Sequence, residues 1–409
     1  MLARGATVLS FNRQQWFIAL LLFVMMVLNY LDRVILSLVS PVMRQELHLT
    51  QLDYAYSVNA FLLAYAIMYV GFGVIADRIG SRRSLTISVT LWSVASLLHA
   101  GIVGFKDLVA YRLFLGATEP GGWTGAVKTV SEHFNPRQRG VVCGLFTSGA
   151  GLGALIAPPL VVWMTLHYGW RSAFVIAGLG GLFWTPLWLI ATRRLRAIET
   201  VQTGLFSDRF RWMVQHPRCL AYVGTRFFGD TTGYFFLFWL PEYLVGSKHF
   251  TLGAVGALGW IPFCWNDAGA LLGGYASGRL IRHLGNPVRS RKAVMTCAAL
   301  FVGAGTLLQR SASIPEVLLS VSLCTFGAGV WASNLHTVAA DAFPDAVVAT
   351  VHGAAGAAGA LGGILFNTFV GHLASLGQYG LIFFVLALLQ PIAVALLWIW
   401  LPKPLALSD

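Results

Sequence analysis

The sequence predicts an all-α integral membrane protein with twelve transmembrane helices arranged in two pseudo-symmetric bundles of six. Its 409 residues are 57% hydrophobic and 11% charged, with a mean hydropathy of +0.70. An average soluble domain, in contrast, is about 25% charged. Apolar stretches of about 20 residues recur from end to end, and each can cross a hydrocarbon core of roughly 30 Å as a helix. The chain is therefore expected to lie in a lipid bilayer.

Twelve such stretches are separated by mostly short polar connections, so we expect successive helices to be antiparallel neighbours. The expected helices run from Trp16 to Val39, Tyr54 to Ala76, Leu85 to Val103, Leu108 to Val130, Val141 to Leu166, Ser172 to Thr192, Leu220 to Val245, Leu252 to Leu280, Ala293 to Leu308, Ile314 to Ala340, Val347 to Leu373 and Tyr379 to Leu401. The first is longer than the apolar core of a signal peptide, so we interpret it as a retained helix. One long polar interval, Arg193 to Arg218, predicts a first bundle at residues 1–192, a cytoplasmic linker at 193–218 and a second bundle at 219–409.

The basic residues indicate how the helices are oriented. The net charge is +12, and Lys and Arg gather in alternate loops, for example at Arg82 and Arg83 and from Arg279 to Lys292. Such an excess marks cytoplasmic loops, so both termini are expected in the cytoplasm. This distribution explains the charge without a nucleic-acid partner. One cytoplasmic loop differs, because Asp341 and Asp345 have no base beside them in the sequence.

The two halves carry traces of an internal repeat. At one common offset, Glu132, Phe134, Gly144 and Gly153 correspond to Asp341, Phe343, Gly353 and Gly362. Repeated halves are typical of secondary transporters, in which the substrate site lies near the bilayer midplane between the halves.

A charged stretch, GVIADRIGSRRS, lies between the second and third expected helices. Its acid and arginines can clamp neighbouring helix ends in one state and release them in another, while its glycines allow close approach. A solvated positive-inside loop is the alternative interpretation. The candidate gating residues are Gly73, Asp77, Arg78, Gly80, Arg82 and Arg83.

This stretch resembles the G-x-x-x-D-R-x-G-x-R-R signature of the major facilitator superfamily. Within that superfamily the chain resembles the anion:cation symporter family, and most narrowly its hexuronate and hexonate transporters. The resembling segments include Asn29 to Arg33, Tyr111 to Gly140 and GYFFLFWLPEYLV from Gly233 to Val245. The chain departs from its relatives at Gly233, where a bulky aromatic residue is commoner, and at Ala150, where relatives often carry a polar side chain. These departures bear on the substrate rather than on the fold.

Among the charged residues inside the expected helices, seven stand out: Asp32, Arg33, Arg112, Glu119, Arg226, Asp230 and Asp267. A charge inside a bilayer usually faces a water-filled cavity or another charge, so each is a functional hypothesis. Arg112 and Glu119 are seven residues apart and share one helix face. Arginine suits carboxylate binding through two parallel hydrogen bonds, whereas desolvation favours the protonated form of Asp and Glu.

The resemblance implies that Asp32 and Glu119 are proton-coupling acids and that Arg33 and Arg112 bind the substrate or act in gating. The simpler alternative is that the four charges only neutralise one another and hold two helices together.

The remaining candidates are less specific. Arg226 and Asp230 are four residues apart, near the cytoplasmic end of their helix, so an ion pair within that helix explains them as well as a substrate contact does. Groups that can meet the hydroxyls and C–H faces of a polyhydroxy acid are Tyr30, Tyr65, Trp123, Tyr234, Asn266, Asp267, Ser333 and Asn334. The tyrosines stand out from ordinary packing because they match cavity positions of the family. His336 and His352 lack partner spacing and are interpreted as packing residues.

These observations predict a secondary transporter, not an enzyme, that carries a sugar acid with protons by alternating access. The sugar acid is expected to be a hexuronate, such as glucuronate or galacturonate, or an aldonate, such as galactonate or gluconate; a smaller or aromatic organic anion is the alternative. No catalytic residue, cofactor or metal is expected, because no nucleophile, metal-ligand or cofactor motif is found and the five cysteines are scattered. The expected setting is a monomer in a bacterial inner membrane.

Overall fold

The computed structural model describes residues 11–134, 136–193, 206–311, 313–343 and 348–401, which contain helices and short connections and no strand. A first set of helices comprises α1 (Arg13–Glu46), α2 (Gln51–His99), α3 (Phe105–Thr118), α4 (Pro120–His133), α5 (Pro136–Tyr168) and α6 (Arg171–Thr192). A second set comprises α7 (Phe206–Gln215), α8 (Pro217–Phe238), α9 (Leu240–Gly246), α10 (Leu252–Leu258), α11 (Ile261–Leu284), α12 (Pro287–Gly303), the 3-10 helix η1 (Ala304–Gln309), α13 (Ile314–Ala342), α14 (Val348–Ser375) and α15 (Tyr379–Trp400). The all-helical prediction is confirmed.

Capping side chains fix the beginnings of the first two helices. The Asn12 side chain accepts a hydrogen bond of 2.7 Å from the backbone N–H of Gln15, and the Gln15 side chain accepts one from the backbone of Asn12. Thr50 and Asp53 form the same capping box at the start of α2. Each box satisfies donors that the first helical turn leaves without partners.

Proline and glycine explain most differences from the expected helices. The expected fourth, seventh and eighth helices are each divided, into α3 and α4, α8 and α9, and α10 and α11, and Pro120, Pro241 and Pro262 stand at the start of the second member of each pair. Proline lacks the backbone N–H that would continue the ladder. The expected second and third helices run on as α2, with Gly80 at φ 80° and ψ 161° inside it.

Eight segments among the described residues are long and apolar enough to cross a membrane by themselves: Arg13–Glu46, Gln51–Gly73, Val142–Tyr168, Arg171–Thr192, Pro287–Gln309, Ile314–Ala339, Val351–Ser375 and Tyr379–Trp400. The divided helices are not among them. Several of the divided helices hold charges that the sequence places inside the membrane, and these charges lower the mean hydropathy of the helices.

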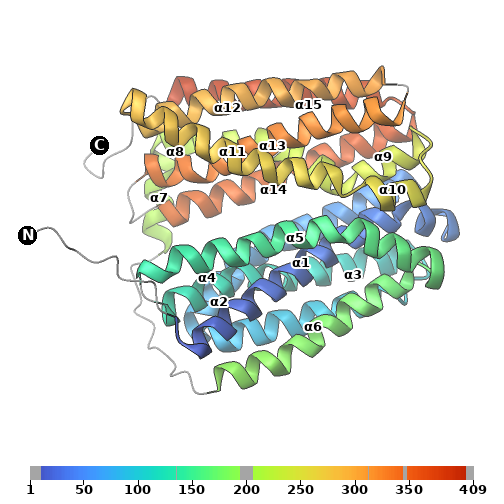
Figure 1. Ribbon diagram of the computed structural model, residues 1–409, viewed down its shortest axis with the longest axis horizontal. Helices are drawn as coiled ribbons and strands as arrows, with labels where there is room; N and C mark the ends of the chain where they lie inside the picture. Colours follow the sequence, from blue (N-terminus) through green and yellow to red (C-terminus); the bar gives the residue numbers. More distant parts are fainter. Residues whose placement is uncertain (1–10, 135, 194–205, 312, 344–347, 402–409) are drawn as a thin grey trace, which may run out of the picture.

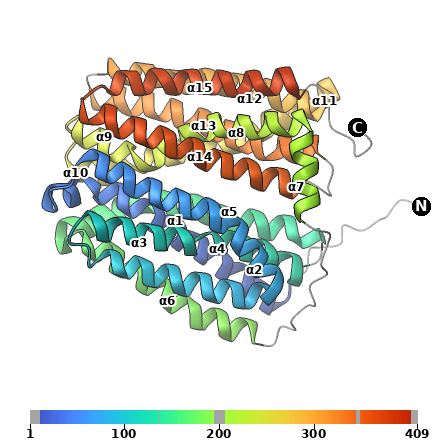
Figure 2. The same cartoon turned by 180° about the vertical axis from the view of Figure 1, so that it is seen from behind.

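The two sets lie side by side, the second above the first in Figure 1, and most of their helices run roughly along the long axis of the molecule (Figures 1 and 2). Within the first set, α2 packs on α3, α4 and α6, and α1 packs on α5; within the second, α11 packs on α13, and α8 packs on α14 and α15. Between the sets, α2 packs along α14, α5 packs against α10 and α1 packs against α9.

The sets are joined tightly at the end where α1 finishes and α9 and α10 lie, which we call the closed end. Arg44 of α1 forms an ion pair with the buried carboxylate of Glu242 of α9. The Tyr54 hydroxyl donates to the carbonyl of Phe238 over 2.5 Å, and Asn59 donates to Thr368 over 2.7 Å.

The other end, where α1 begins and α15 finishes, is the open end. Every hydrogen bond and ion pair that is described between the two sets lies in the closed half of the molecule. A Cβ atom added at Gly73, Gly144 or Gly353, near the open end, would meet no atom within 4 Å. No described hydrogen bond or ion pair therefore joins the sets at the open end, where these glycines have free space beside them.

Candidate functional site

An ion pair between α1 and the junction of α3 and α4 is the centre of the candidate site. Arg33 donates from Nε and Nη2 to the same oxygen of Glu119, Oε1, over 2.8 and 2.6 Å. The Glu119 side chain is 1% exposed and that of Arg33 11% exposed. Glu119 stands where α3 gives way to Pro120, so the proline helps to position the carboxylate. The second oxygen of Glu119 has no hydrogen-bond partner among the described residues.

Arg112 lies about two turns of α3 before Glu119, on the same face, and is completely buried. None of its three guanidinium nitrogens has a hydrogen-bond partner among the described residues, and the group stacks on the Phe61 ring at 4.2 Å. An unpartnered buried cation is costly unless a ligand or a rearranged neighbour can pair with it.

Asp32 adjoins Arg33 in sequence but points to the interior of the first set. Its carboxylate is 3% exposed and accepts a hydrogen bond of 2.6 Å from the Ser96 hydroxyl of α2. The four charges predicted from the first and fourth expected helices are thus gathered into one region of the first set.

Aromatic rings surround the Arg33 guanidinium. Its central carbon lies 4.8 Å from the Tyr65 ring, 5.1 Å from the Tyr30 ring and 5.8 Å from the Phe61 ring. Trp123 of α4 packs edge-on against Tyr30, with ring centroids 6.4 Å apart. Cation–π contacts of this kind hold an arginine in place while leaving its N–H groups free to bind.

The second set contributes an ion pair within α8. Arg226 binds Asp230 over 2.8 Å, four residues along the helix, as the structural interpretation of this pair expects. Their side chains are 13% and 15% exposed. Tyr234, one turn further, packs against α14, where a Cβ atom at Gly363 would lie 2.6 Å from its ring.

The polar candidates of α11 and α13 differ in exposure, because some lie at the surface and others are buried where the two helices pack. Asp267 is exposed and lies across from α5, where a Cβ atom at Gly151 would lie 2.7 Å from its carboxylate. Asn266 donates to the carbonyl of Thr325 over 3.2 Å. Asn334 is fully buried between α13 and α11, and donates to Val330 and, over 3.4 Å, to the Ser333 hydroxyl.

The structure brings together two histidines that the sequence left apart. The rings of His336 and His352 have centroids 5.1 Å apart, and His352 Nδ1 lies 3.2 Å from the Tyr222 hydroxyl. That hydroxyl also lies 3.1 Å from the carbonyl of Leu335. Two separate helices, α13 and α14, carry the pair, so spacing within either helix could not reveal it.

The candidate gating residues lie at the open end. Arg78 and Arg83 are exposed, while Arg82 donates to the carbonyl of Leu189 over 3.3 Å. The side chain of Asp77 lies outside the described residues. Neither Gly73 nor Gly80 is in close contact with another helix in this state; Gly80 instead has a positive φ, which a side chain would strain.

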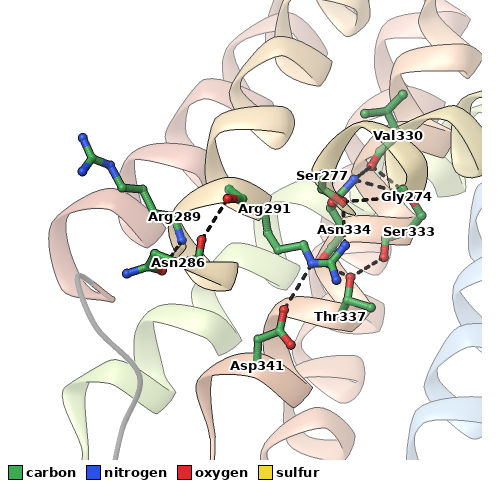
Figure 3. A network of polar contacts seen from close by, with 11 residues as sticks. Gly274, Ser277, Asn286, Arg289, Arg291, Val330, Ser333, Asn334, Thr337 and Asp341 are labelled. Atoms are coloured by element: carbon green, nitrogen blue, oxygen red, sulfur yellow. Dashed lines mark hydrogen bonds and ion pairs between the residues drawn. The ribbon is translucent and has the colours of Figure 1, made fainter. Parts of the chain in front are cut away.

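Near the open end, the two sets contain corresponding polar contacts at the repeated positions Glu132 and Asp341. In the first set, Ser81 donates to Glu132 over 2.5 Å. In the second, Figure 3 shows Arg291 reaching from α12 to Asp341 of α13, over 3.2 Å, and to Ser277 of α11, over 2.5 Å. Asp341 therefore has a basic partner that its own loop lacks. Asp345, in the same loop, lies outside the described residues.

The ion pair of Arg44 and Glu242 was missed by sequence reasoning. The two residues are 198 positions apart, and Glu242 also accepts a hydrogen bond from Ser40 over 3.1 Å. The one available signal was an acid inside the apolar segment FLFWLPEYLV.

Comparison with known proteins gives the family and the fold. The profile of the Major Facilitator Superfamily matches residues 22–367. The hexuronate transporter of Escherichia coli K12 is 27% identical over 94% of this chain and 93% of its own length. The probable L-galactonate transporter of the same strain is 30% identical over 73% of this chain and 70% of its own length.

Solved structures agree with this result. The crystal structure of a D-xylose-proton symporter superposes with a TM-score of 0.78 at 16% identity, covering 95% of this chain and 99% of that one. A bacterial homologue of the human lysosomal transporter Spinster, in an inward-facing and occupied conformation, gives 0.74 at 17% identity and 96% coverage of both chains. At these identities the likeness concerns the fold alone.

Proposed function

Because this chain belongs to the major facilitator superfamily, whose members are transporters and not enzymes, we propose that it carries a sugar acid together with protons across a bacterial inner membrane. The chain is a multi-pass membrane protein with the fold of that superfamily. Transport by this fold proceeds by alternating access, in which a central site opens to one side of the membrane and then to the other.

A substrate with one carboxylate and several hydroxyls suits the site. The relatives are named as a hexuronate transporter, a probable L-galactonate transporter and, in Bacillus subtilis, a probable galactarate/D-glucarate transporter. Hexuronates and L-galactonate have one carboxylate, galactarate and D-glucarate have two, and all of them carry several hydroxyls. The planar guanidinium of Arg33, whose side chain is 11% exposed, suits a carboxylate, and Tyr30 and Tyr65 beside it offer ring faces and hydroxyl groups. The same rings would also accept an aromatic acid, which is the second candidate substrate.

The proposal is supported by one observation: Glu119 occupies the two N–H groups of Arg33 that a substrate carboxylate would use. A substrate carboxylate cannot take both N–H groups of Arg33 while ionised Glu119 holds them. Protonation of Glu119 weakens that ion pair and frees the guanidinium. Proton uptake and substrate binding are therefore linked, because each makes the other more favourable.

Asp32 and Arg112 complete the charge balance. Asp32 is the second proton acceptor, and its hydrogen bond to Ser96 keeps it apart from the substrate. Arg112, whose nitrogens lack partners in this state, pairs with Glu119 or with the substrate when the helices rearrange. If protons outnumber substrate charges, the membrane potential drives inward transport by roughly 2.3 kcal/mol per net charge per 100 mV.

In this proposal the open end faces the cytoplasm, so the structure is an inward-open state of a monomeric carrier. The bundles at residues 1–192 and 219–409 rock about the central site, and the linker at 193–218, which includes α7, joins them. Arg44, Glu242, Tyr54 and Asn59 then separate as the outer side opens. The charged stretch around Arg78 and Arg83 closes the cytoplasmic side in the opposite state.

The test is transport in proteoliposomes. Labelled glucuronate, galacturonate, galactonate and gluconate are offered with and without an inward proton gradient, using the wild type, Glu119→Gln and the control Glu46→Gln, which removes an exposed carboxylate from the same helix as Arg33. We expect Glu119→Gln to lose gradient-driven accumulation and keep exchange of internal for external substrate. Failure of an active preparation to transport or exchange any sugar acid would overturn the proposal.

A further inference from the structure

Gly233 lies on a stripe of α8 that is uncovered at this residue. Four helices pack along α8: α14 through Gly363 and Tyr234, α15 through Gln390, which donates to the carbonyl of Gly229 over 2.9 Å, α13 through Trp331, and α1. Gly233 itself is exposed, and a Cβ atom added there would meet nothing within 4 Å.

The uncovered stripe faces the cavity and not the lipid. Gly233 follows Arg226 by seven residues, so the two lie within about 20° of each other around the helix. Arg226 and its partner Asp230 form an ion pair, which is unfavourable against hydrocarbon and normal beside a water-filled space. Gly233 therefore lines the same space as Arg226.

Close packing does not explain this glycine. A glycine inside a helix is destabilising relative to alanine, so we expect a packing or functional requirement at this position. At Gly229 the reason is contact, because a Cβ atom would lie 2.5 Å from the Trp331 ring. At Gly233 there is no such contact.

The opposite transport state does not explain it either. Gly73, Gly144 and Gly353 also have empty surroundings, but they lie near the open end, where the two sets approach when that end closes. Gly233 lies near the α9 end of α8, toward the closed end, where the sets already touch. The remaining explanation is that the space is kept for the substrate.

We propose that Gly233 determines substrate size, and that the space beside it admits a sugar acid with a second sugar unit, such as an aldobionate or a dimer of uronic acids. This inference rests on the proposed function. With its carboxylate at Arg33, such an acid extends its second sugar unit along α8. Asp230, three residues before Gly233 on the same helix, offers a hydrogen-bonding group for that unit.

The experiment compares acids of one and of two sugar units from the same series in proteoliposomes. Exchange of labelled gluconate is measured against unlabelled cellobionate, and exchange of labelled galacturonate against digalacturonate, using whichever one-unit acid is transported. Uptake of the labelled two-unit acid is then measured directly. The variants are Gly233→Phe, which fills the space, and Gly233→Ala, which adds one methyl group. Leu220→Phe is the matched control, since it adds an aromatic ring at an exposed position of the same helix.

We expect the wild type to transport the two-unit acid and Gly233→Phe to lose that transport by about tenfold or more, while transport of the one-unit acid changes by less than about threefold. Gly233→Ala and Leu220→Phe are expected to keep both. A wild type that carries the one-unit acid but neither binds nor carries the two-unit acid overturns this inference and leaves the proposed function intact. Equal loss of both acids in a folded Gly233→Phe protein overturns it as well, whereas absence of all sugar-acid transport in the wild type overturns the proposed function.

Discussion

Arg33 places two of its N–H groups on a single oxygen of Glu119, at 2.8 and 2.6 Å, across the contact between α1 and the α3–α4 junction. The pair joins the residue expected to bind the substrate to the residue expected to bind the proton. A substrate carboxylate therefore cannot use these two N–H groups while Glu119 holds them.

Replacing Arg33 with lysine is expected to weaken substrate binding by about tenfold or more, because an ammonium group is a point charge and cannot bind a carboxylate through two parallel hydrogen bonds. The measurement is the concentration dependence of exchange in proteoliposomes. Arg13→Lys, an exposed substitution at the start of the same helix, is the control. Unchanged affinity in Arg33→Lys would exclude Arg33 as the carboxylate ligand.

Breaking the ion pair of Arg44 and Glu242 should favour the state in which the closed end has opened. Arg44→Ala leaves the buried carboxylate without its cation, so we expect it to destabilise the present state by ~3 kcal/mol. The double variant Arg44→Glu with Glu242→Arg should recover part of the loss. Double electron–electron resonance between spin labels on the two sides of the closed end measures the population of each state. A distance distribution that none of these substitutions alters would show that this ion pair does not hold the closed end together.

Two glycines of α14 should respond in opposite ways to alanine. A methyl group at Gly362 would overlap the carbonyl of Phe227 in α8, so Gly362→Ala is expected to lower stability by about 1–3 kcal/mol. At Gly353 a methyl group meets nothing within 4 Å, so Gly353→Ala should be neutral or raise the stability of this state by up to about 1 kcal/mol. Thermal unfolding in detergent gives both values. Equal effects at the two positions would contradict the packing of α14 on α8.

Loss of Asp341 should loosen the second set without abolishing substrate binding. Arg291 would keep its bond to Ser277 but lose its carboxylate, and we expect Asp341→Ala to lower stability by about 1–2 kcal/mol. Thermal unfolding and substrate affinity are measured on the same preparation. Since the proposed ligands of the substrate carboxylate lie in the first set, a large loss of affinity at unchanged stability would place Asp341 in the site instead.

Much of the fold follows from local features of the sequence. Apolar stretches of membrane length and the prolines that interrupt them predict the helices, and the charges inside those stretches predict the cluster of Asp32, Arg33 and Glu119. The rest depends on contacts between distant segments. The partners Arg44 and Glu242, and the rings of His336 and His352, meet only after the helices pack, so no spacing along one helix reveals them.

The polar contacts that lie within each set near the open end also bear on how the molecule moves. Ser81 holds Glu132 inside the first set, and Arg291 holds Asp341 and Ser277 inside the second, so each set is stiffened within itself. The described polar bonds between the sets are few and lie at one end. Most internal contacts can therefore be identical in both transport states, and the energy difference between the states depends on a small number of interfacial bonds. A carrier built in this way can be retuned by single substitutions at that interface, which change the speed of its cycle and leave its substrate preference as it was.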